Sequence, residues 1–211
     1  MKTLNTKAKV ILVTVMMLLW VGCSDNDTTK PTVNDEPFTF LKVGNEWEYE
    51  NFGGMPEDIW KIKIVSENNG YYILEYDDDE SDNAIWYSNG DYWKTFNDDA
   101  SIGITMLYKN CYVGQRWDTT ASNGYATSKV TKEVLSISEK VTVPAGTFTR
   151  CIKVKVEENT KYTWNGEEFE IKILTYSYIH KNIGIVMMEV IEGPAPIKGV
   201  VSKLKSTYFL K

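Results

Sequence analysis

Four Asn-Gly pairs separate runs of alternating apolar and polar residues, and they constrain the fold of this chain more than any other feature. Asn-Gly between such runs is the strongest short-range signal for a β-hairpin, because both residues tolerate the positive φ angles of a tight turn. The pairs are Asn69-Gly70, Asn89-Gly90, Asn123-Gly124 and Asn165-Gly166. No long amphipathic helix is evident, so the pattern predicts an all-β fold: a single antiparallel sheet, built as a meander of hairpins, with little helix.

The pair Asn165-Gly166 predicts the clearest register. With a two-residue turn, Tyr162 faces Phe169 and Lys161 faces Glu170. Aromatic and opposite-charge pairs of this kind each stabilise a sheet by about 0.2–1 kcal/mol. The same count gathers one apolar set on a single face, and a slip of one residue would turn that set away. The set is Ile152, Val154, Val156, Ile171, Ile173 and Ile179.

The first hairpin favours a longer loop. A two-residue turn at Asn69-Gly70 would place Ile64 opposite Glu75. A three-residue loop over 68–70, with Gly70 left-handed, instead places Ile64 opposite Leu74 and Lys63 opposite Glu75. We therefore expect the longer loop here.

Aromatic residues crowd the segment from Tyr71 to Phe96. A two-residue turn at Asn89-Gly90 pairs Tyr87 with Tyr92 and Trp86 with Trp93. These pairs fall on opposite faces, because neighbouring residues of a strand point in opposite directions. Only one pair can meet the core, and the sequence does not say which. The segment is an aromatic-rich core, a flat platform for a sugar or another apolar-faced ligand, or a protein interface.

Two segments resemble each other. Residues 43–48 read Val-Gly-Asn-Glu-Trp-Glu, and residues 113–118 read Val-Gly-Gln-Arg-Trp-Asp. Each precedes polar and glycine residues and then an alternating strand. The repetition indicates either a duplicated start of a strand, with Gly allowing a bend and Trp capping the core, or agreement by chance.

The N-terminus has the pattern of an export signal. Lysines precede an apolar run from Ala8 to Val21, which is shorter than the roughly 20 residues of a membrane-spanning helix. Residues 18–23, Leu-Leu-Trp-Val-Gly-Cys, resemble the bacterial lipoprotein box, although Trp20 stands where the box usually has Leu. The resemblance implies a lipoprotein signal peptide over 1–22 and lipidation of Cys23. The alternative is an ordinary cleaved signal with a chance cysteine.

The residues after Cys23 suggest a location. Ser24-Asp25-Asn26-Asp27 resembles the tag of lipoproteins that some Gram-negative bacteria export to the outer face of the outer membrane. We therefore expect an outer-membrane, cell-surface lipoprotein, with the periplasmic face of that membrane as the alternative. Residues 23–37 are polar, contain two prolines and predict a flexible tether.

The charge balance excludes one class of partner. Removal of residues 1–22 takes away three lysines and no acid, leaving 20 basic and 29 acidic residues and a net charge of −9. Nucleic-acid binding calls for clustered Lys and Arg, so we expect none. Residues 38–211 suit a single β domain, which at this size buries about 70% of its unfolded surface.

The residues that could perform chemistry are few. The single histidine, His180, excludes a multi-histidine metal site. The acidic run 77–83 lacks the spacing of an EF-hand and predicts a solvated loop. His180 falls opposite Cys151 in the register above, but no orienting carboxylate or oxyanion hole accompanies the pair. Cys151 and Cys111 are either bridged or free, and we expect them to be free. We predict no enzyme activity, no metal and no cofactor.

A corner motif carries a further resemblance. Residues 143–148, Val-Pro-Ala-Gly-Thr-Phe, run into a strand at Cys151 and are followed later by Asn-Ile-Gly-Ile-Val over 182–186. Together with Leu41, Gly44 and Trp47, these motifs resemble a family of small extracytoplasmic bacterial proteins, most of which have no assigned function. The resemblance spans roughly residues 38–211. It implies an antiparallel sheet curled into a half-barrel or barrel, similar to the Lol lipoprotein carriers, and it supplies no catalytic residues.

Two functions remain. The first is a non-catalytic, surface-anchored binding module for a glycan or another ligand, with Trp86, Tyr87, Tyr92 and Trp93 as candidate ligand-binding residues. The second is a carrier that holds a lipid or other hydrophobic ligand in the half-barrel. Its candidate lining is Met187, Met188, Val186 and Val190. Methionine suits a carrier because its flexible side chain adapts to irregular ligands.

Overall fold

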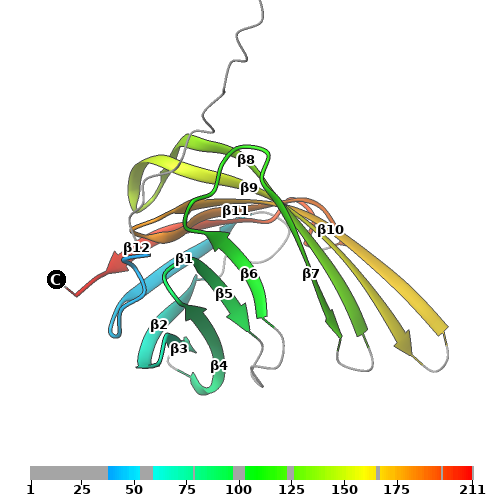
Figure 1. Ribbon diagram of the computed structural model, residues 1–211, viewed down its shortest axis with the longest axis horizontal. Helices are drawn as coiled ribbons and strands as arrows, with labels where there is room; N and C mark the ends of the chain where they lie inside the picture. Colours follow the sequence, from blue (N-terminus) through cyan, green and yellow to red (C-terminus); the bar gives the residue numbers. More distant parts are fainter. Residues whose placement is uncertain are drawn as a thin grey trace, which may run out of the picture. The chain divides into compact units, whose positions relative to one another are not determined.

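The described part of the chain is β-structure (Figure 1). The computed structural model describes residues 38–52, 59–77, 79–96, 103–122, 126–164, 167–195 and 197–210. These residues contain twelve strands and no helix. The strands are β1 (Glu46–Phe52), β2 (Ile59–Asn68), β3 (Tyr71–Tyr76), β4 (Asp79–Ser88), β5 (Tyr92–Phe96), β6 (Gly103–Tyr108), β7 (Arg116–Ser122), β8 (Ala126–Val143), β9 (Gly146–Trp164), β10 (Glu167–His180), β11 (Gly184–Glu192) and β12 (Val201–Tyr208). The predicted signal peptide 1–22, Cys23 and the tether 23–37 lie outside the described residues.

The strands form one antiparallel sheet that nearly closes into a barrel. Its order is β6-β5-β4-β3-β2-β1-β12-β11-β10-β9-β8-β7. Within each run of six, consecutive strands are neighbours, as expected for a hairpin meander. Pairing of β1 with β12 joins the two runs, so β6 and β7 are the edges of the sheet. The predicted fold class, a single antiparallel sheet curled into a half-barrel or barrel, is confirmed.

The register predicted for the longest hairpin is confirmed. Tyr162 pairs with Phe169 and Lys161 with Glu170, and the count continues without a shift to Ile152 opposite Ile179. The predicted apolar set therefore shares one face. The corner motif before this hairpin forms a tight turn, because Val143 pairs with Gly146 and only residues 144 and 145 lie between them.

The first hairpin combines the predicted register with a different loop. Ile64 pairs with Leu74 and Lys63 with Glu75, as predicted. The loop has only two residues, however: Asn69 and Gly70, with φ angles of 51° and 81°. Positive φ at both positions is the type I′ arrangement. A β-bulge between Ile64 and Ser66 restores the register that we had attributed to a longer loop.

The register predicted for the aromatic hairpin is wrong by two residues. Ser88 pairs with Trp93 and Trp86 with Thr95, so four residues, 89–92, lie between the last paired residues of β4 and β5. Gly90 has a positive φ of 92°, whereas Asn89 does not. The Asn89 Oδ1 atom instead accepts the backbone N–H groups of Asp91 and Tyr92, at 3.0 and 3.3 Å. This Asx-type turn replaces the tight turn. Because the observed register differs from the predicted one by an even number of residues, each side chain still points to its predicted face.

The two similar segments make the same turn. Gly44 donates its N–H to the Ile64 carbonyl at 2.7 Å, and Ile64 donates back to the Asn45 carbonyl at 3.0 Å. In the second copy, Gly114 donates to the Val134 carbonyl at 2.8 Å, and Val134 donates back to Gln115 at 2.9 Å. The glycine φ angles are 87° and 84°. The repetition in the sequence therefore marks a repeated start of a hairpin, at β1–β2 and at β7–β8.

The tryptophan of each copy also packs in the same way. Trp47 meets Phe209, which follows β12, with ring centres 5.4 Å apart, and Trp117 meets Tyr108, at the end of β6, at the same distance. Both contacts are edge to face. Each tryptophan thus joins the first strand of one six-stranded run to the end of the other run.

Side chains bridge β6 and β7, where no ladder is formed. The indole N–H of Trp117 donates to the Thr105 carbonyl at 3.0 Å. The Lys132 ammonium reaches the same carbonyl at 3.0 Å and the Met106 sulfur at 3.0 Å. Lys132 is only 3% exposed, and burial lowers the pKa of its ammonium to about 7. The equivalent position in the other copy, opposite Trp47, is Ile62.

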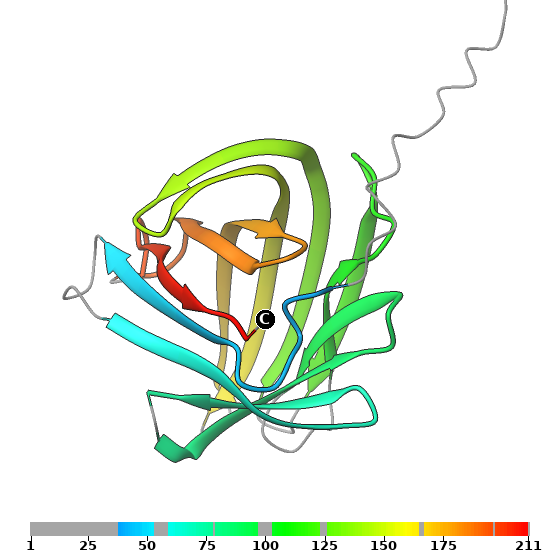
Figure 2. The same cartoon turned by 90° about the vertical axis from the view of Figure 1, so that its left-hand side faces the viewer.

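Phe40 organises the core. Figure 2 shows the segment that begins at residue 38, in blue, running inside the curve of the sheet. The Phe40 ring centre lies 5.1 Å from that of Trp93, 6.0 Å from Trp86 and 6.1 Å from Trp47, each contact edge to face. The Asn45 amide holds the segment by donating to the Phe40 carbonyl at 2.9 Å. Aromatic rings from β1, β4 and β5 thus fill this part of the interior.

Candidate functional site

The hairpin β4–β5 divides its aromatic residues between the two faces of the sheet. Trp86 and Trp93 point inward, are 5% and 0% exposed, and belong to the core around Phe40. Tyr87 and Tyr92 lie on the opposite, outer face and are partly buried, with ring centres 6.0 Å apart. The predicted separation by face is confirmed, and the structure identifies the tryptophans as the core pair.

The outer tyrosines belong to a longer row that crosses four strands. We call it the aromatic row; its members are Tyr71, Tyr87, Tyr92, Phe96 and Tyr108. Tyr71 and Tyr87 are cross-strand partners with ring centres 4.6 Å apart. The Tyr92 ring centre lies 6.3 Å from that of Tyr108, and that of Phe96 lies 6.0 Å from that of Tyr71. Tyr71 is 42% exposed. The rings thus form a continuous, partly exposed surface over β3, β4, β5 and β6.

Two further features shape the aromatic row. The Lys94 ammonium lies 4.8 Å from the centre of the Tyr92 ring, within the range of a cation–π contact. Gly103 faces the Phe96 ring so closely that a Cβ atom at this position would lie 2.6 Å from it. A glycine at this position is therefore what allows the Phe96 ring to lie against β6.

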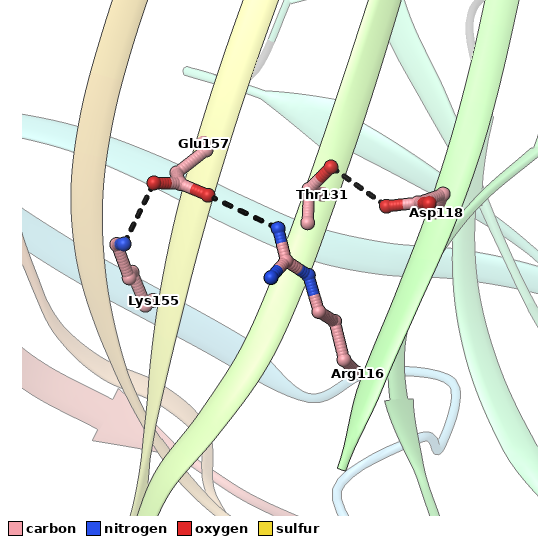
Figure 3. A network of polar contacts seen from close by, with 5 residues as sticks. All are labelled: Arg116, Asp118, Thr131, Lys155 and Glu157. Atoms are coloured by element: carbon pink, nitrogen blue, oxygen red, sulfur yellow. Dashed lines mark hydrogen bonds and ion pairs between the residues drawn. The ribbon is translucent and has the colours of Figure 1, made fainter. Parts of the chain in front are cut away.

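The outer face of the other six-stranded run has a different chemistry. Glu157 on β9 bonds Lys155 at 2.6 Å and Arg116 on β7 at 3.6 Å, and Thr131 donates to Asp118 at 2.6 Å (Figure 3). The bond from Lys155 holds the pKa of the Glu157 carboxyl below its usual value. Exposed ion pairs of this kind contribute little to stability. Over β3–β6 the outer face thus presents aromatic rings, whereas over β7–β9 it presents the charged side chains that we call the ionic outer face.

The methionines proposed as a carrier lining are separated by the strand. Met187 pairs with Tyr178 and Lys203, whereas Met188 pairs with Ser177 and Ser202. Neighbouring residues of β11 point to opposite faces, so the two methionines do not line one surface.

The thiols and the histidine do not form a nucleophilic site. Cys111 and Cys151 are free and buried, as expected. The Cys151 thiol lies 3.8 Å from the Phe148 carbonyl, and burial raises its pKa to about 11. Burial raises the pKa of Cys111 to about 11 as well. His180 packs on the Phe148 ring, and burial lowers its pKa. A reactive thiol needs the opposite shift, toward the thiolate.

The described residues offer no metal site. No group of three or more His, Cys, Asp or Glu side chains among them is arranged to hold a metal ion. Of the acidic run 77–83, Asp77 binds the Lys61 backbone N–H through its Oδ1 atom at 2.7 Å, and residue 78 lies outside the described part. Nor do the described residues include a helix of the length and apolarity needed to span a membrane.

Solved structures share this architecture. An exported protein with a YmcC-like fold from Bacteroides fragilis is 19% identical, with a TM-score of 0.58, and the match covers 82% of this chain and 100% of that one. A protein from Parabacteroides distasonis described as a lipoprotein is 14% identical, with a TM-score of 0.57, and the match covers 83% and 100%. This chain has their fold.

The sequence comparisons add one partial match. A family model described as DUF3108-like matches residues 117–194, from β7 into the loop after β11. No curated protein gave a significant match. The matched segment begins after the aromatic row, which lies within residues 71–108, and it contains Asp118, Thr131, Lys155 and Glu157 of the ionic outer face.

Sequence reasoning found part of the site. It named Tyr87 and Tyr92, and it placed Tyr71 and Phe96 within the aromatic-rich segment. It missed Tyr108, which lies beyond that segment in β6. The signal for Tyr108 was its position next to Leu107, which is fully buried, because alternation turns the following side chain outward.

Proposed function

We propose that this chain is a non-catalytic lipoprotein whose β domain is displayed at the cell surface and binds a glycan on the aromatic row. The observation that carries the proposal is that the β4–β5 hairpin divides its aromatic side chains between the two faces of the sheet. Its tryptophans supply the core, so its tyrosines are not needed there, and they continue into a row of rings across four strands.

The chemistry of the aromatic row suits a sugar. The face of an aromatic ring carries partial negative charge, and the C–H groups on one side of a pyranose carry partial positive charge. Tyrosine adds a hydroxyl that exchanges hydrogen bonds with sugar hydroxyls. Partly buried rings held by cross-strand neighbours lose little conformational freedom on binding, which favours affinity.

The membrane anchor is proposed from the sequence. The box over 18–23 and the acidic tag over 24–27 support acylation at Cys23 and display on the outer face of the outer membrane. The two structural neighbours are described as an exported protein and a lipoprotein, which agrees with a location outside the cytoplasm. With a net charge of −9, attraction to anionic lipid would not supply the anchor, and the acyl chains would.

A carrier function has less support. It needs interior space for an acyl chain, whereas Phe40, Trp47 and Trp93 occupy the interior around β1 and β5 and are fully buried. The proposed methionine lining is divided between two faces. We therefore favour binding on the outer surface.

Two experiments test the proposal. Labelling of cells with a fatty-acid analogue should mark the wild type and not Cys23→Ala; equal labelling would contradict lipidation at Cys23. A glycan array probed with the domain 38–211 should show binding that Tyr87→Ala/Tyr92→Ala abolishes. Binding that is unchanged in this variant, or no binding by the wild type, would contradict the proposed surface.

A further inference from the structure

We propose that the hollow beside Tyr71, on the outer side of β2, β3 and β4, binds the terminal sugar residue of the glycan, and that this residue is an uncharged pyranose. This inference rests on the proposed function and extends it from a binding surface to a mode of recognition. It predicts that the protein binds the end of the glycan chain, and that the next sugar units of the glycan lie along the aromatic row.

The hollow is continuous with the aromatic row. It has a volume of about 570 Å³, within the range of about 300–1,000 Å³ that is usual for small-molecule sites. Its lining residues are Ser66, Asn68, Asn69, Tyr71, Ile73 and Ile85. Tyr71 belongs to both features, because it borders the hollow and its ring centre lies 4.6 Å from that of Tyr87. A ligand in the hollow therefore meets the first ring of the row.

A β-bulge brings the polar residues to this face. Ile64 is fully buried, and simple alternation would turn Ser66 and Asn68 toward the core with it. The bulge between Ile64 and Ser66 reverses this, so that Ser66 pairs with Ile73 and Asn68 with Tyr71, on the outer face. Bulges commonly re-aim side chains beside binding sites. The irregularity in β2 is thus what places a hydroxyl and an amide at the hollow.

The turn holds the rim of the hollow in place. The Gly70 N–H donates to the Glu67 carboxylate at 2.8 Å, and the Gly70 carbonyl accepts the Ser88 N–H at 2.9 Å. A Cβ atom on Gly70 would lie 2.4 Å from the Ser88 carbonyl oxygen, so only glycine allows this approach. The rim is therefore fixed to β4 before any ligand binds, which lowers the entropic cost of binding.

The lining of the hollow matches an uncharged sugar. The cross-strand pair Ile73 and Ile85 provides an apolar floor, and Tyr71 provides a ring. Ser66, Asn68 and Asn69 provide hydroxyl and amide groups, which both donate and accept hydrogen bonds, as sugar hydroxyls do. No lining residue is charged, and the net charge of −9 disfavours an anionic ligand.

The test uses neutral oligosaccharides as probes, namely the malto-, cello-, laminari- and manno-series from monosaccharide to hexasaccharide, with oligogalacturonides as the charged counterpart. Binding to the domain 38–211 is measured by calorimetry. Three variants are compared with wild type: Ser66→Ala/Asn68→Ala at the rim, Tyr92→Ala along the row, and Thr120→Ala/Asn182→Ala as a control on exposed residues of the other run. Melting curves establish that each variant is folded.

We expect wild type to bind one neutral series, including its shortest members. The rim variant should lose about tenfold in affinity at every length, as expected for two lost hydrogen bonds, while Tyr92→Ala weakens only the longer members. A rim variant that binds like wild type while Tyr92→Ala is impaired would overturn this inference and leave the proposed function standing. Preference for oligogalacturonides would overturn the uncharged ligand, and absence of binding to every probe would overturn both proposals.

Discussion

Trp86 and Trp93 pack edge to face on the inner side of the sheet, with ring centres 5.0 Å apart. They are not cross-strand partners, because Trp93 pairs with Ser88, and the contact is diagonal. On the other side of the same two strands, Tyr87 and Tyr92 lie among the rings of the aromatic row. A single hairpin thus supplies both the centre of the core and the middle of the candidate binding surface.

This division predicts unequal effects on stability. Trp86→Ala or Trp93→Ala should each lower the free energy of unfolding by about 3–5 kcal/mol, because a large buried ring is removed. Tyr87→Ala/Tyr92→Ala should cost about 1 kcal/mol, as expected for lost cross-strand contacts on a partly exposed face. Urea denaturation of the domain 38–211 measures both. Equal losses in the two sets would mean that the tyrosines are structural and would remove the basis of the binding surface.

The buried Lys132 predicts a specific pH dependence. Burial lowers its pKa to about 7 in the folded state, from 10.5 for a free lysine. Between these values the unfolded chain binds a proton that the folded chain does not, so stability should rise with pH across this window. In Lys132→Met this contribution disappears. The variant should therefore be more stable than wild type near pH 6, and the difference should shrink as the pH approaches about 10.

A matched control makes the Lys132 prediction specific. Lys172→Met removes a lysine whose side chain is 70% exposed. This variant should change the free energy of unfolding by a similar small amount near pH 6 and near pH 10. A methionine should fit at position 132, because an apolar residue, Ile62, occupies the equivalent position opposite Trp47. A stability difference between Lys132→Met and wild type that is the same at both pH values would contradict the account.

The bridge between β6 and β7 predicts a local effect on dynamics. Trp117→Phe keeps the ring packing and removes the hydrogen bond to the Thr105 carbonyl, which should cost about 1 kcal/mol. Because β6 is an edge strand, amide exchange in Gly103–Tyr108 should accelerate more than elsewhere. Trp47→Phe is the matched control, since it loses the bond to the Ile183 carbonyl and leaves β6 intact. Equal acceleration of β6 in both variants would argue against the bridge.

The sequence predicted registers well where side chains identify their partners. Over 152–179 the apolar alternation and the pair Lys161–Glu170 allow only one alignment, and the structure has it. The bulge after Ile64 was missed because a pattern of period two does not locate an inserted residue when exposed polar residues follow it. The loop after Ser88 was misjudged because the Asn89 side chain binds two backbone N–H groups, which competes with the tight turn that Asn-Gly usually forms.

The candidate site was predictable only in part, because contacts between residues far apart in the sequence decide which face of β4 and β5 points inward. Both faces of β4 and β5 carry aromatic residues, so the pattern alone does not say which face is inside. The decision comes from Phe40, which lies more than forty residues earlier in the chain and packs against Trp86 and Trp93. A contact of such long range leaves no mark in the local sequence of the hairpin. For Tyr108, the alternation after Leu107 indicates an outward side chain, but only the pairing of β5 with β6 places its ring in the row.

The most direct test of the central claim is the affinity of three proteins for the neutral oligosaccharide that binds wild type best, measured by calorimetry. They are wild type, Tyr87→Ala/Tyr92→Ala, and Arg116→Ala/Lys155→Ala as a control on the ionic outer face. The account predicts at least about a tenfold loss for the tyrosine variant and an unchanged affinity for the control. Unchanged affinity in the tyrosine variant, or equal losses in the two variants, would contradict it.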